Sequence, residues 1–411
     1  LLTWEARGVL RLKKPFIVGI TGSVGKTSAK EAIATVLGEH FTVRKSPKSF
    51  NSEIGIPLTI LGLENAWNSP RLWAENLVRG FIRIFSRDPY PEILVLEMGV
   101  DRPGDMDRLL AFVRPDVAVV TAIGKTPVHV EFFAGPEAVA HEKAKLVRAL
   151  AKDGVAILNA DDKMTFDMRK LTDARLISYG FSKEADIRAS QFKHMVKAHV
   201  ARGITFKIDV EGKTMPIRVE GVIGEQVVFA LLAAAGVGIA HKLNLVEIGE
   251  ALTKYKPQPG RLNVIAGKNE TLIIDDSYNS SPMAAEAALK VLESINSPRK
   301  IAVLGDMLEL GKFTSEEHRR VGAIAAQVAD VVVAVGVRAK FMENGKHKNF
   351  HWFADSRAAA DFLASFVQAH DVILVKGSQG MRMERIVEAL MAEPERAKEL
   401  LVRQEQYWKK S

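Results

Sequence analysis

The residues best suited to chemistry form a glycine-bounded loop near the start of the chain. The loop consists of Gly22, Ser23, Val24, Gly25, Lys26, Thr27 and Ser28. It follows an apolar run typical of a buried strand and precedes a helical pattern, so backbone N–H groups and the positive end of the helix dipole would converge on one point. Such a point suits a phosphate group. Lys26 would add a cation, and Thr27 a hydroxyl ligand for Mg2+.

The loop differs by one position from the longer phosphate-binding pattern G-x-x-x-x-G-K-[ST]. Ile20 stands where the first glycine of that pattern would be, which leaves the shorter form T-G-x-x-G-K-T. A plain glycine turn between a strand and a helix is the alternative. That alternative does not require a lysine and a hydroxyl residue at the two positions where phosphate chemistry needs them.

Two further polar side chains follow apolar runs in the first half of the chain. Glu97 ends the run 92–97, and His129 lies shortly after the run 117–124. Because ligands gather where parallel strands end, these side chains should approach Lys26. Glu97 would then hold Mg2+ directly or through water. The alternatives are a surface acid that caps a strand, and a histidine that is only a satisfied polar residue.

Three polar strings follow apolar runs in the second half, at residues 275–282, 305–311 and 375–378. The first holds an aspartate and an asparagine with a tyrosine between them, which could grip a ribose and stack on a base. Turn chemistry is an equal alternative, because Asp, Asn, Ser and Gly are the residues that turns use.

The elements that position these residues are strands that alternate with helical patterns, which predicts an α/β fold. A first domain, residues 1–256, would hold a phosphate-loop ATPase core with a mostly parallel sheet. The period changes to alternation over 185–222, which predicts a small antiparallel appendage. Residues 256–261 contain two prolines and a glycine and read as a linker. A second, Rossmann-like α/β domain would occupy residues 257–411.

Composition excludes several classes of protein. The 411 residues are 47% hydrophobic, contain no cysteine and carry a formal charge of +8. Lysine and arginine are spread along the chain, which does not favour nucleic-acid binding. The lack of cysteine fits a reducing compartment. With no apolar run near the roughly 18 residues of a membrane span and no secretory signal, the cytoplasm is the expected location.

A basic amphipathic helix is predicted over residues 70–87. Its apolar side chains are Leu72, Trp73, Leu77, Phe81, Ile84 and Phe85, and its arginines are Arg71, Arg79, Arg83 and Arg87. Such a helix could rest on an anionic membrane surface. A helix packed on its own domain with solvated arginines is the favoured interpretation.

Taken together, these motifs and their order resemble the Mur ligase family. The resemblance runs from about residue 15 to 390. It rests on the segments 20–27, 50–57, 97–99, 121–124 with His129, 142–143, 259–261, 275–279, 303–311 and 375–378. The resemblance implies that the loop from Gly22 to Thr27 binds the ATP phosphates. It also implies that Thr27 and Glu97 serve one Mg2+ and His129 a second. Lys143 matches the lysine that these ligases carbamylate.

The resemblance also implies sites in both domains for nucleotide and substrates. Arg261, Asp276 and Asn279 would reach ATP from the second domain when the domains close. Lys376, Gly377 and Ser378 would lie near the incoming amine, and Asn51 near the muramoyl-tripeptide. The implied reaction is ATP-dependent: a substrate carboxylate forms an acyl phosphate, which D-alanyl-D-alanine opens to an amide.

Several positions depart from the family pattern. Only a short helix precedes the first strand, so we expect this chain to lack the family's N-terminal uridine-nucleotide domain. Substitutions relative to the family occur at Val24, Ser52, Ser281, Gln226, Val227 and Ala230. Ala230 replaces an asparagine that would touch adenine. Two other functions stay open: a ligase with another acceptor, of the folylpolyglutamate or cyanophycin type, and a non-catalytic ATP-binding partner of a ligase. A monomer is expected.

Overall fold

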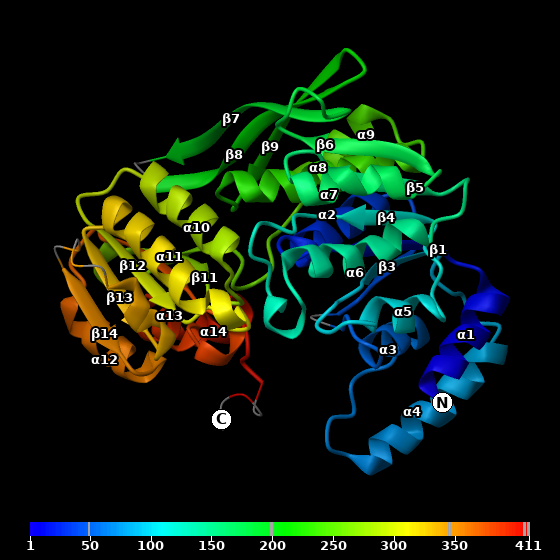
Figure 1. Cartoon of the computed structure of the whole chain (residues 1–411), viewed down its shortest axis with the longest axis horizontal. Helices are drawn as coiled ribbons and strands as arrows, with labels where there is room; N and C mark the ends of the chain where they lie inside the picture. The colour runs from blue at the N-terminus through cyan, green and yellow to red at the C-terminus, as the bar shows by residue number, and fades with distance from the viewer. Residues whose placement is uncertain are drawn as a thin grey trace.

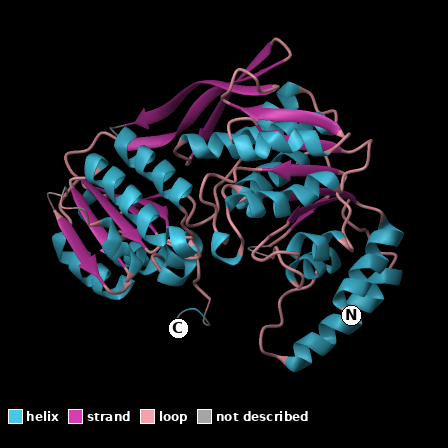
Figure 2. Cartoon of the chain, viewed as in Figure 1, coloured by secondary structure: helices cyan, strands magenta, loops and turns pink. Residues whose placement is uncertain are grey.

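The computed structural model describes residues 1–47, 50–197, 200–343, 345, 347, 349–405 and 408. Two β-sheets carry helices on both of their faces, and they lie in the two halves of the chain (Figures 1 and 2). The predicted α/β class, with a large mostly parallel sheet, a smaller antiparallel part and a second sheet, is confirmed.

The first sheet has nine strands in the order β2-β3-β1-β4-β5-β6-β7-β8-β9. Its parallel strands are β1 Phe16–Thr21, β2 Val43–Lys45, β3 Ile93–Glu97, β4 Val117–Val120, β5 Val155–Asn159 and β6 Arg175–Gly180. β1 lies between β3 and β4, with Ile20 opposite both Glu97 and Val119. The phosphate-loop candidate and Glu97 therefore leave the sheet at the same edge, as the strand pattern predicts.

The predicted antiparallel appendage is present and extends this sheet. Its strands are β7 Ile187–Lys197, β8 Val200–Val210 and β9 Lys213–Glu220. β7 pairs in parallel with the end of β6 through Tyr179 and Gly180, and β8 and β9 follow in antiparallel register. Residues 198 and 199 of the predicted appendage lie outside the described residues.

Helices cover both faces of the first sheet. They are α1 Leu2–Lys13, α2 Lys26–Gly38, α3 Gly55–Leu61, α4 Pro70–Phe85, α5 Asp105–Leu110, α6 Pro136–Arg148, α7 Lys163–Phe166, α8 Glu225–Ala240 and α9 Leu245–Thr253. α2, α8 and α9 share one apolar core with the inner strands, and α1, α3, α5 and part of α6 share another. No helix in the described ranges is long and apolar enough to cross a membrane.

The second sheet has the order β10-β11-β15-β12-β13-β14 and is parallel except for the pair β10 and β11. Its strands are β10 Asn263–Ala266, β11 Leu272–Asp276, β12 Lys300–Gly305, β13 Val331–Val335, β14 Phe350–Phe353 and β15 Val372–Lys376. Its helices are α10 Pro282–Ser294, α11 Thr314–Val328, α12 Ser356–Phe366, α13 Glu384–Leu390 and α14 Ala397–Leu400. The domain boundary after residue 256 stays a prediction.

The basic helix α4 buries less of its apolar surface than the sequence suggests. Ile84 is buried, but Leu72, Phe81 and Phe85 are 48%, 50% and 67% exposed. The helix does pack on its own domain with exposed arginines at 71, 79 and 87, as expected, but these three apolar side chains stay largely uncovered. The reason is geometric, because α4 packs lengthwise against α1 and only the stripe that faces α1 and the domain is covered.

Candidate active site

The glycine-bounded loop has the conformation that a phosphate site requires. Gly22 has φ +142° and Gly25 has φ +90°, and α2 begins directly after Gly25. The first helical hydrogen bond runs from Ala29 N to Gly25 O, so the amides of residues 26–28 point out of the helix end without helical partners. The amides of Ser23 and Val24 instead donate to Ala122 O, which ties the loop to the end of β4.

Replacement of Gly22 by alanine should destabilise the protein by about 1–3 kcal/mol. A side chain disfavours φ +142°, and its Cβ would overlap the hydroxyl of Thr121. Thermal unfolding measures the effect. Gly38→Ala is the matched control, because a Cβ at Gly38 meets no atom within 4 Å. An unchanged melting temperature in Gly22→Ala would show that the loop tolerates a side chain.

Lys26 and Thr27 face a carboxylate from the neighbouring strand. Lys26 Nζ donates to Gly22 O at 2.8 Å, and burial lowers the pKa of Lys26. Thr27 Oγ1 donates to Glu97 Oε2 at 3.1 Å. Lys30, buried one turn along α2, places its Nζ 3.8 Å from the same oxygen. Lys30 was not singled out from the sequence, although its spacing of three from Thr27 puts both on one helix face.

His129 is held between the two domains by carboxylates. It has φ +68°, and its Nε2 lies 3.3 Å from Asp101 Oδ1. Its Nδ1 lies 2.7 Å from Glu309 Oε2, and the proximity of His129 is the main cause that lowers the pKa of Glu309. Across the described parts of the chain, no group of three His, Cys, Asp or Glu side chains is arranged to hold a metal.

Lys143 is a second buried lysine in this region, besides Lys30. Its side chain lies on α6 and the residue is only 1% exposed. Burial, together with the charge of Lys26, lowers the pKa of Lys143 to about 7. The carboxylate of the neighbouring Glu142 accepts hydrogen bonds at Oε1 from the amides of Gly104 and Met106, at 3.1 and 3.0 Å. Near neutral pH a large part of Lys143 is thus an uncharged amine.

The second domain reaches the loop through Arg261. Its Nη2 donates to Thr27 Oγ1 at 3.3 Å, and its guanidinium carbon lies 4.1 Å from the ring centre of Tyr278. The domains also meet at Thr126, whose hydroxyl donates to Glu317 at 2.5 Å. The two halves of the chain are therefore in direct contact at the loop.

The polar residues at the strand ends of the second sheet lie in two neighbouring groups, one around Lys376 and one that includes Ser378. Lys376 Nζ lies 2.5 Å from Asp276 Oδ2 and donates to Asn279 O at 3.0 Å. Burial lowers the pKa of Lys376 despite this partner. A Cβ at Gly377 would lie 2.7 Å from Met383, so the chain passes closely there. Ser378 lies apart from Lys376, facing the loop with Asn279.

Two cavities lie between the domains. The first, about 310 Å3, is polar and lies at the loop. Its lining includes Ser23, Gly25, Lys26, Thr27, Asn51, Glu97, Asp101, His129, Arg261, Tyr278, Asn279, Glu309 and Ser378. The second, about 250 Å3, lies beside it. Its lining includes Val24, Ser28, Asn159, Asp161, Tyr179, Gln226, Phe229, Ala230, Arg261, Asp276 and Lys376.

The structure therefore gathers most of the predicted site residues, with Arg261 shared by both cavities. Asn51 lines the polar cavity and also a further hollow of about 310 Å3, and its carbonyl accepts from Gly99 N at 2.8 Å. Sequence reasoning missed Lys30, Asp101 and Glu309. The last two stand close to motifs that had been recognised, at 97–99 and within 305–311.

Two regions of the chain match models of known protein families. Residues 80–238 match the Mur ligase middle domain, and residues 260–379 match the Mur ligase, glutamate ligase domain. The chain is 31% identical over 408 residues to the UDP-N-acetylmuramoyl-tripeptide–D-alanyl-D-alanine ligase of Mycobacterium leprae, covering 92% of this chain and 74% of that relative. To the enzyme of the same name from Bacillus subtilis it is 29% identical, covering 92% and 76%.

Solved structures agree with these matches. MurF ligase from Thermotoga maritima in complex with ADP is 27% identical with a TM-score of 0.79, covering 96% of this chain and 84% of that one. MurF from Acinetobacter baumannii has 25% identity and the same TM-score, covering 94% and 79%. Folylpolyglutamate synthase from Mycobacterium tuberculosis, at 17% identity and a TM-score of 0.70, covers 94% and 95% and shares the fold alone.

Proposed function

The chain belongs to the Mur ligase family, and from this premise we propose that it is an ATP-dependent amide ligase of peptidoglycan precursor synthesis. It would join D-alanyl-D-alanine to UDP-N-acetylmuramoyl-tripeptide through an acyl phosphate and release ADP and phosphate. These are the substrates in the names of the relatives at 29% and 31% identity. A cytoplasmic monomer is part of the proposal.

One observation carries the proposal: a polar cavity in which the phosphate loop of the first domain meets strand-end residues of the second. The hydrogen bond from Arg261 to Thr27 joins the two sets directly. In the first step a carboxylate must approach the γ-phosphate, and both are anions. Lys26 from the first domain and Arg261 from the second both supply positive charge to this cavity, and the helix end supplies free amides.

The residues present fit ATP and Mg2+. The amides of residues 26–28 and Lys26 Nζ suit the phosphates, and the hydroxyl of Thr27 beside the carboxylate of Glu97 offers the oxygen ligands that Mg2+ prefers. When bound, Mg2+ would neutralise phosphate charge. Lys30 holds Glu97 in place and offsets its charge. His129 would serve a second Mg2+ through one ring nitrogen, in place of the carboxylate that now lies beside it, while the carboxylate at the other nitrogen orients the ring.

Carbamylation of Lys143 would complete the oxygen ligands for the second Mg2+. An amine reacts with CO2 only in its uncharged form, losing a proton and becoming a carboxylate-like group. The pKa of about 7 makes that form abundant at neutral pH. The added negative charge would also face Lys26, the cation whose charge helps to lower this pKa. These features support the carbamate, which remains part of the proposal.

The second cavity is the proposed site of the nucleoside. Asp276 and Lys376, which form an ion pair there, would approach the ribose, and Lys376 acts by holding Asp276. Asn279 and Ser378 line the polar cavity, where Asn279 would approach the phosphates of ATP and Ser378 the incoming amine. Gly377, between Lys376 and Ser378 in the chain, would stay with the amine. The resemblance placed Lys376 near the incoming amine. We instead assign it to the nucleotide site, because it pairs with Asp276 in the second cavity. Asn51, between the polar cavity and the neighbouring hollow, would contact the muramoyl-tripeptide.

The decisive experiment follows ADP release while substrates are omitted one at a time. We expect release only when ATP, Mg2+, UDP-N-acetylmuramoyl-tripeptide and D-alanyl-D-alanine are all present, and a product whose mass equals that of the joined substrates less water. ADP release with a folate or polyamide acceptor and glutamate, but not with these substrates, would support the alternative ligase. Nucleotide binding without turnover on any acceptor would support a non-catalytic partner.

Base selectivity should be weak, because Ala230 offers no hydrogen bond to the base. One lost hydrogen bond is worth on the order of 1 kcal/mol, or several-fold in affinity. We expect calorimetry to show that ADP binds less than about a thousandfold more tightly than GDP, a limit near 4 kcal/mol. Discrimination above that limit would mean that another side chain reads the base. Gln226→Ala then tests the remaining amide from α8 in this cavity.

A further inference from the structure

Helices α1 and α4 together expose a ridge of large apolar side chains. We define this apolar ridge as Trp4, Leu12, Val78, Phe81, Ile82 and Phe85, which are between 50% and 67% exposed. Figure 1 shows both helices on the side of the first domain that is remote from the second domain. Scattered apolar side chains on a surface need no explanation, but a contiguous group of this size marks an interaction surface.

The ridge is continuous across the two helices and firmly supported. The ring of Trp4 stacks on that of Phe81 at 6.4 Å, and Phe81 meets Phe85 at 5.5 Å. Small residues allow this close approach, because a Cβ at Gly8 would already lie 3.0 Å from Ile84. The opposite sides of the helices are buried, so the exposed sides have a fixed position.

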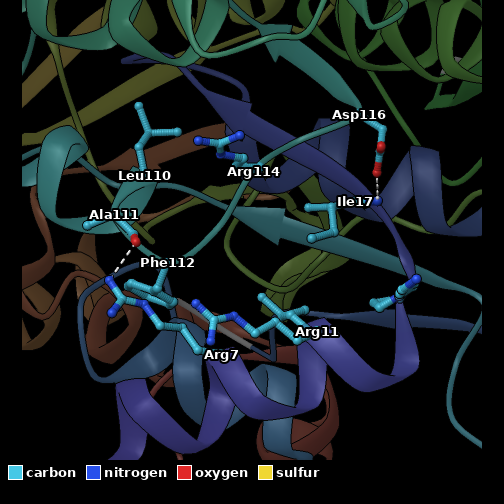
Figure 3. Close-up of a pocket in the computed structure, with 11 residues that line it drawn as sticks. Arg7, Arg11, Ile17, Leu110, Ala111, Phe112, Arg114 and Asp116 are labelled. Atoms are coloured by element: carbon cyan, nitrogen blue, oxygen red, sulfur yellow. Dashed lines mark hydrogen bonds between the residues drawn. The ribbon is translucent and has the colours of Figure 1, made fainter.

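A basic hollow, shown in Figure 3, lies beside helix α1, which also carries Trp4 and Leu12 of the ridge. It has a volume of about 430 Å3 and includes Arg7, Arg11, Lys14 and Arg114 in its lining. At 3.6 residues per turn, Arg7 and Arg11 form one flank of α1, beside Trp4, and Lys14 follows directly after the end of the helix. Within the described part of the chain, Arg11, Lys14 and Arg114 make no ion pair. The one carboxylate in the hollow, Asp116, accepts from Ile17 N at 2.7 Å.

The α4 side of the ridge is also basic. Arg71 and Arg79 are exposed there, and the one exposed acid of α4, Glu75, lies 3.8 Å from Arg79. The only acid of α1, Glu5, is buried at 4% exposure. The apolar ridge therefore lies between two cationic flanks.

We propose that the apolar ridge and its basic flanks dock this protein on the surface of an anionic phospholipid bilayer. Aromatic and aliphatic side chains enter the boundary between headgroups and acyl chains, while arginine and lysine at the flanks contact lipid phosphates. The charges decide against a second copy of the chain as the occupant. A symmetric dimer through the ridge would bring cationic flanks together whichever way the two ridges aligned.

The experiment is flotation of the 411-residue chain with vesicles of phosphatidylcholine, with and without about 30% phosphatidylglycerol. We expect binding to the anionic vesicles and little to the neutral ones. The double variant Ile82→Ser/Phe85→Ser should weaken partitioning at least about tenfold. Val246→Ser/Val337→Ser is its matched control, because these side chains are 56% and 73% exposed but lie away from the ridge. The control should bind like the parent.

A second pair of variants tests the flanks. Arg11→Gln/Arg79→Gln removes one cation from each side and should weaken binding to anionic vesicles about tenfold or more. Lys170→Gln/Arg218→Gln, with side chains 67% and 68% exposed elsewhere, should not. Unfolding temperatures confirm that each variant is folded. Equal binding to neutral vesicles, or unchanged binding of both ridge and flank variants, would overturn the proposal. The proposal would also be overturned if the parent chain bound no vesicles and formed a dimer that the Ile82→Ser/Phe85→Ser variant did not form.

Discussion

Lys26→Ala is expected to lower ligase turnover by a factor on the order of 10³ or more while the protein stays folded. Lys26 Nζ sits at the loop, 2.8 Å from Gly22 O, on the wall of the polar cavity where the phosphoryl group would transfer. Without Lys26, the substrate carboxylate and the γ-phosphate would repel each other more strongly as they approach, because one neutralising cation is missing. ADP release in the presence of both substrates measures the loss.

The same variant should not lower the melting temperature. Burial lowers the pKa of Lys26, so the folded protein holds this charge less favourably than the unfolded chain does. Removing it relieves that cost. Lys254→Ala is the control, because this lysine is 57% exposed on the surface of the same domain and pairs with Glu39. Turnover within a few-fold of the parent in Lys26→Ala would remove the loop lysine from the mechanism.

Lys143→Ala should be nearly inactive, with a loss comparable to that of Lys26→Ala, because the anionic oxygens of the carbamate would be absent. A small carboxylate such as formate, added to the buffer, should restore part of the activity by supplying similar oxygens. Lys145→Ala is the matched control, since Lys145 lies on the same helix but pairs with Asp107 and Glu142 nearer the surface.

A readout independent of activity is the carbamate itself, followed by NMR with ¹³C-bicarbonate. With a pKa of about 7, Lys143 is mostly an ammonium at pH 6 and mostly an amine at pH 8. The carbamate signal should therefore be stronger at pH 8, and it should disappear in Lys143→Ala. An active parent protein with no such signal would contradict the carbamate.

The free energy of unfolding should also depend on pH, between the pKa of Lys143 in the folded protein and its ordinary value. The pKa of Lys143 is about 7 in the folded protein against an ordinary value of 10.5, so the unfolded chain binds more protons between these values. In bicarbonate-free buffer, the free energy of unfolding should rise with pH through this window in the parent relative to Lys143→Ala. Thermal unfolding at several pH values measures the difference.

The pattern of elements was largely predictable, because it depends on local periodicity. The apolar run at 331–335 is a strand with those bounds, and the antiparallel alternation after residue 185 became β7, β8 and β9. Other strands gave weaker signals. Arg175–Gly180 carries polar residues among its apolar ones, and Phe350–Phe353 is a partly exposed edge. Both become strands because a neighbouring strand offers hydrogen-bond partners.

The sequence by itself determined the chemistry that this protein can attempt. Gly22 and Gly25 permit the backbone of a phosphate loop, and Lys26, Thr27 and Glu97 carry the charges and oxygens that phosphate and Mg2+ need. These inferences succeed because they depend on residue type, on short spacing and on the shared edge of parallel strands.

Only the tertiary structure decided which charges are partnered and which surfaces stay open. Lys30 pairs with Glu97, His129 lies between Asp101 and Glu309, and Lys376 turns to Asp276. The partners in the last two groups are between 28 and 180 positions apart in the chain. Their meeting depends on strand order and domain closure, which short-range patterns do not encode. In the same way, the pattern of α4 shows an apolar face, but only its packing against α1 leaves part of that face exposed.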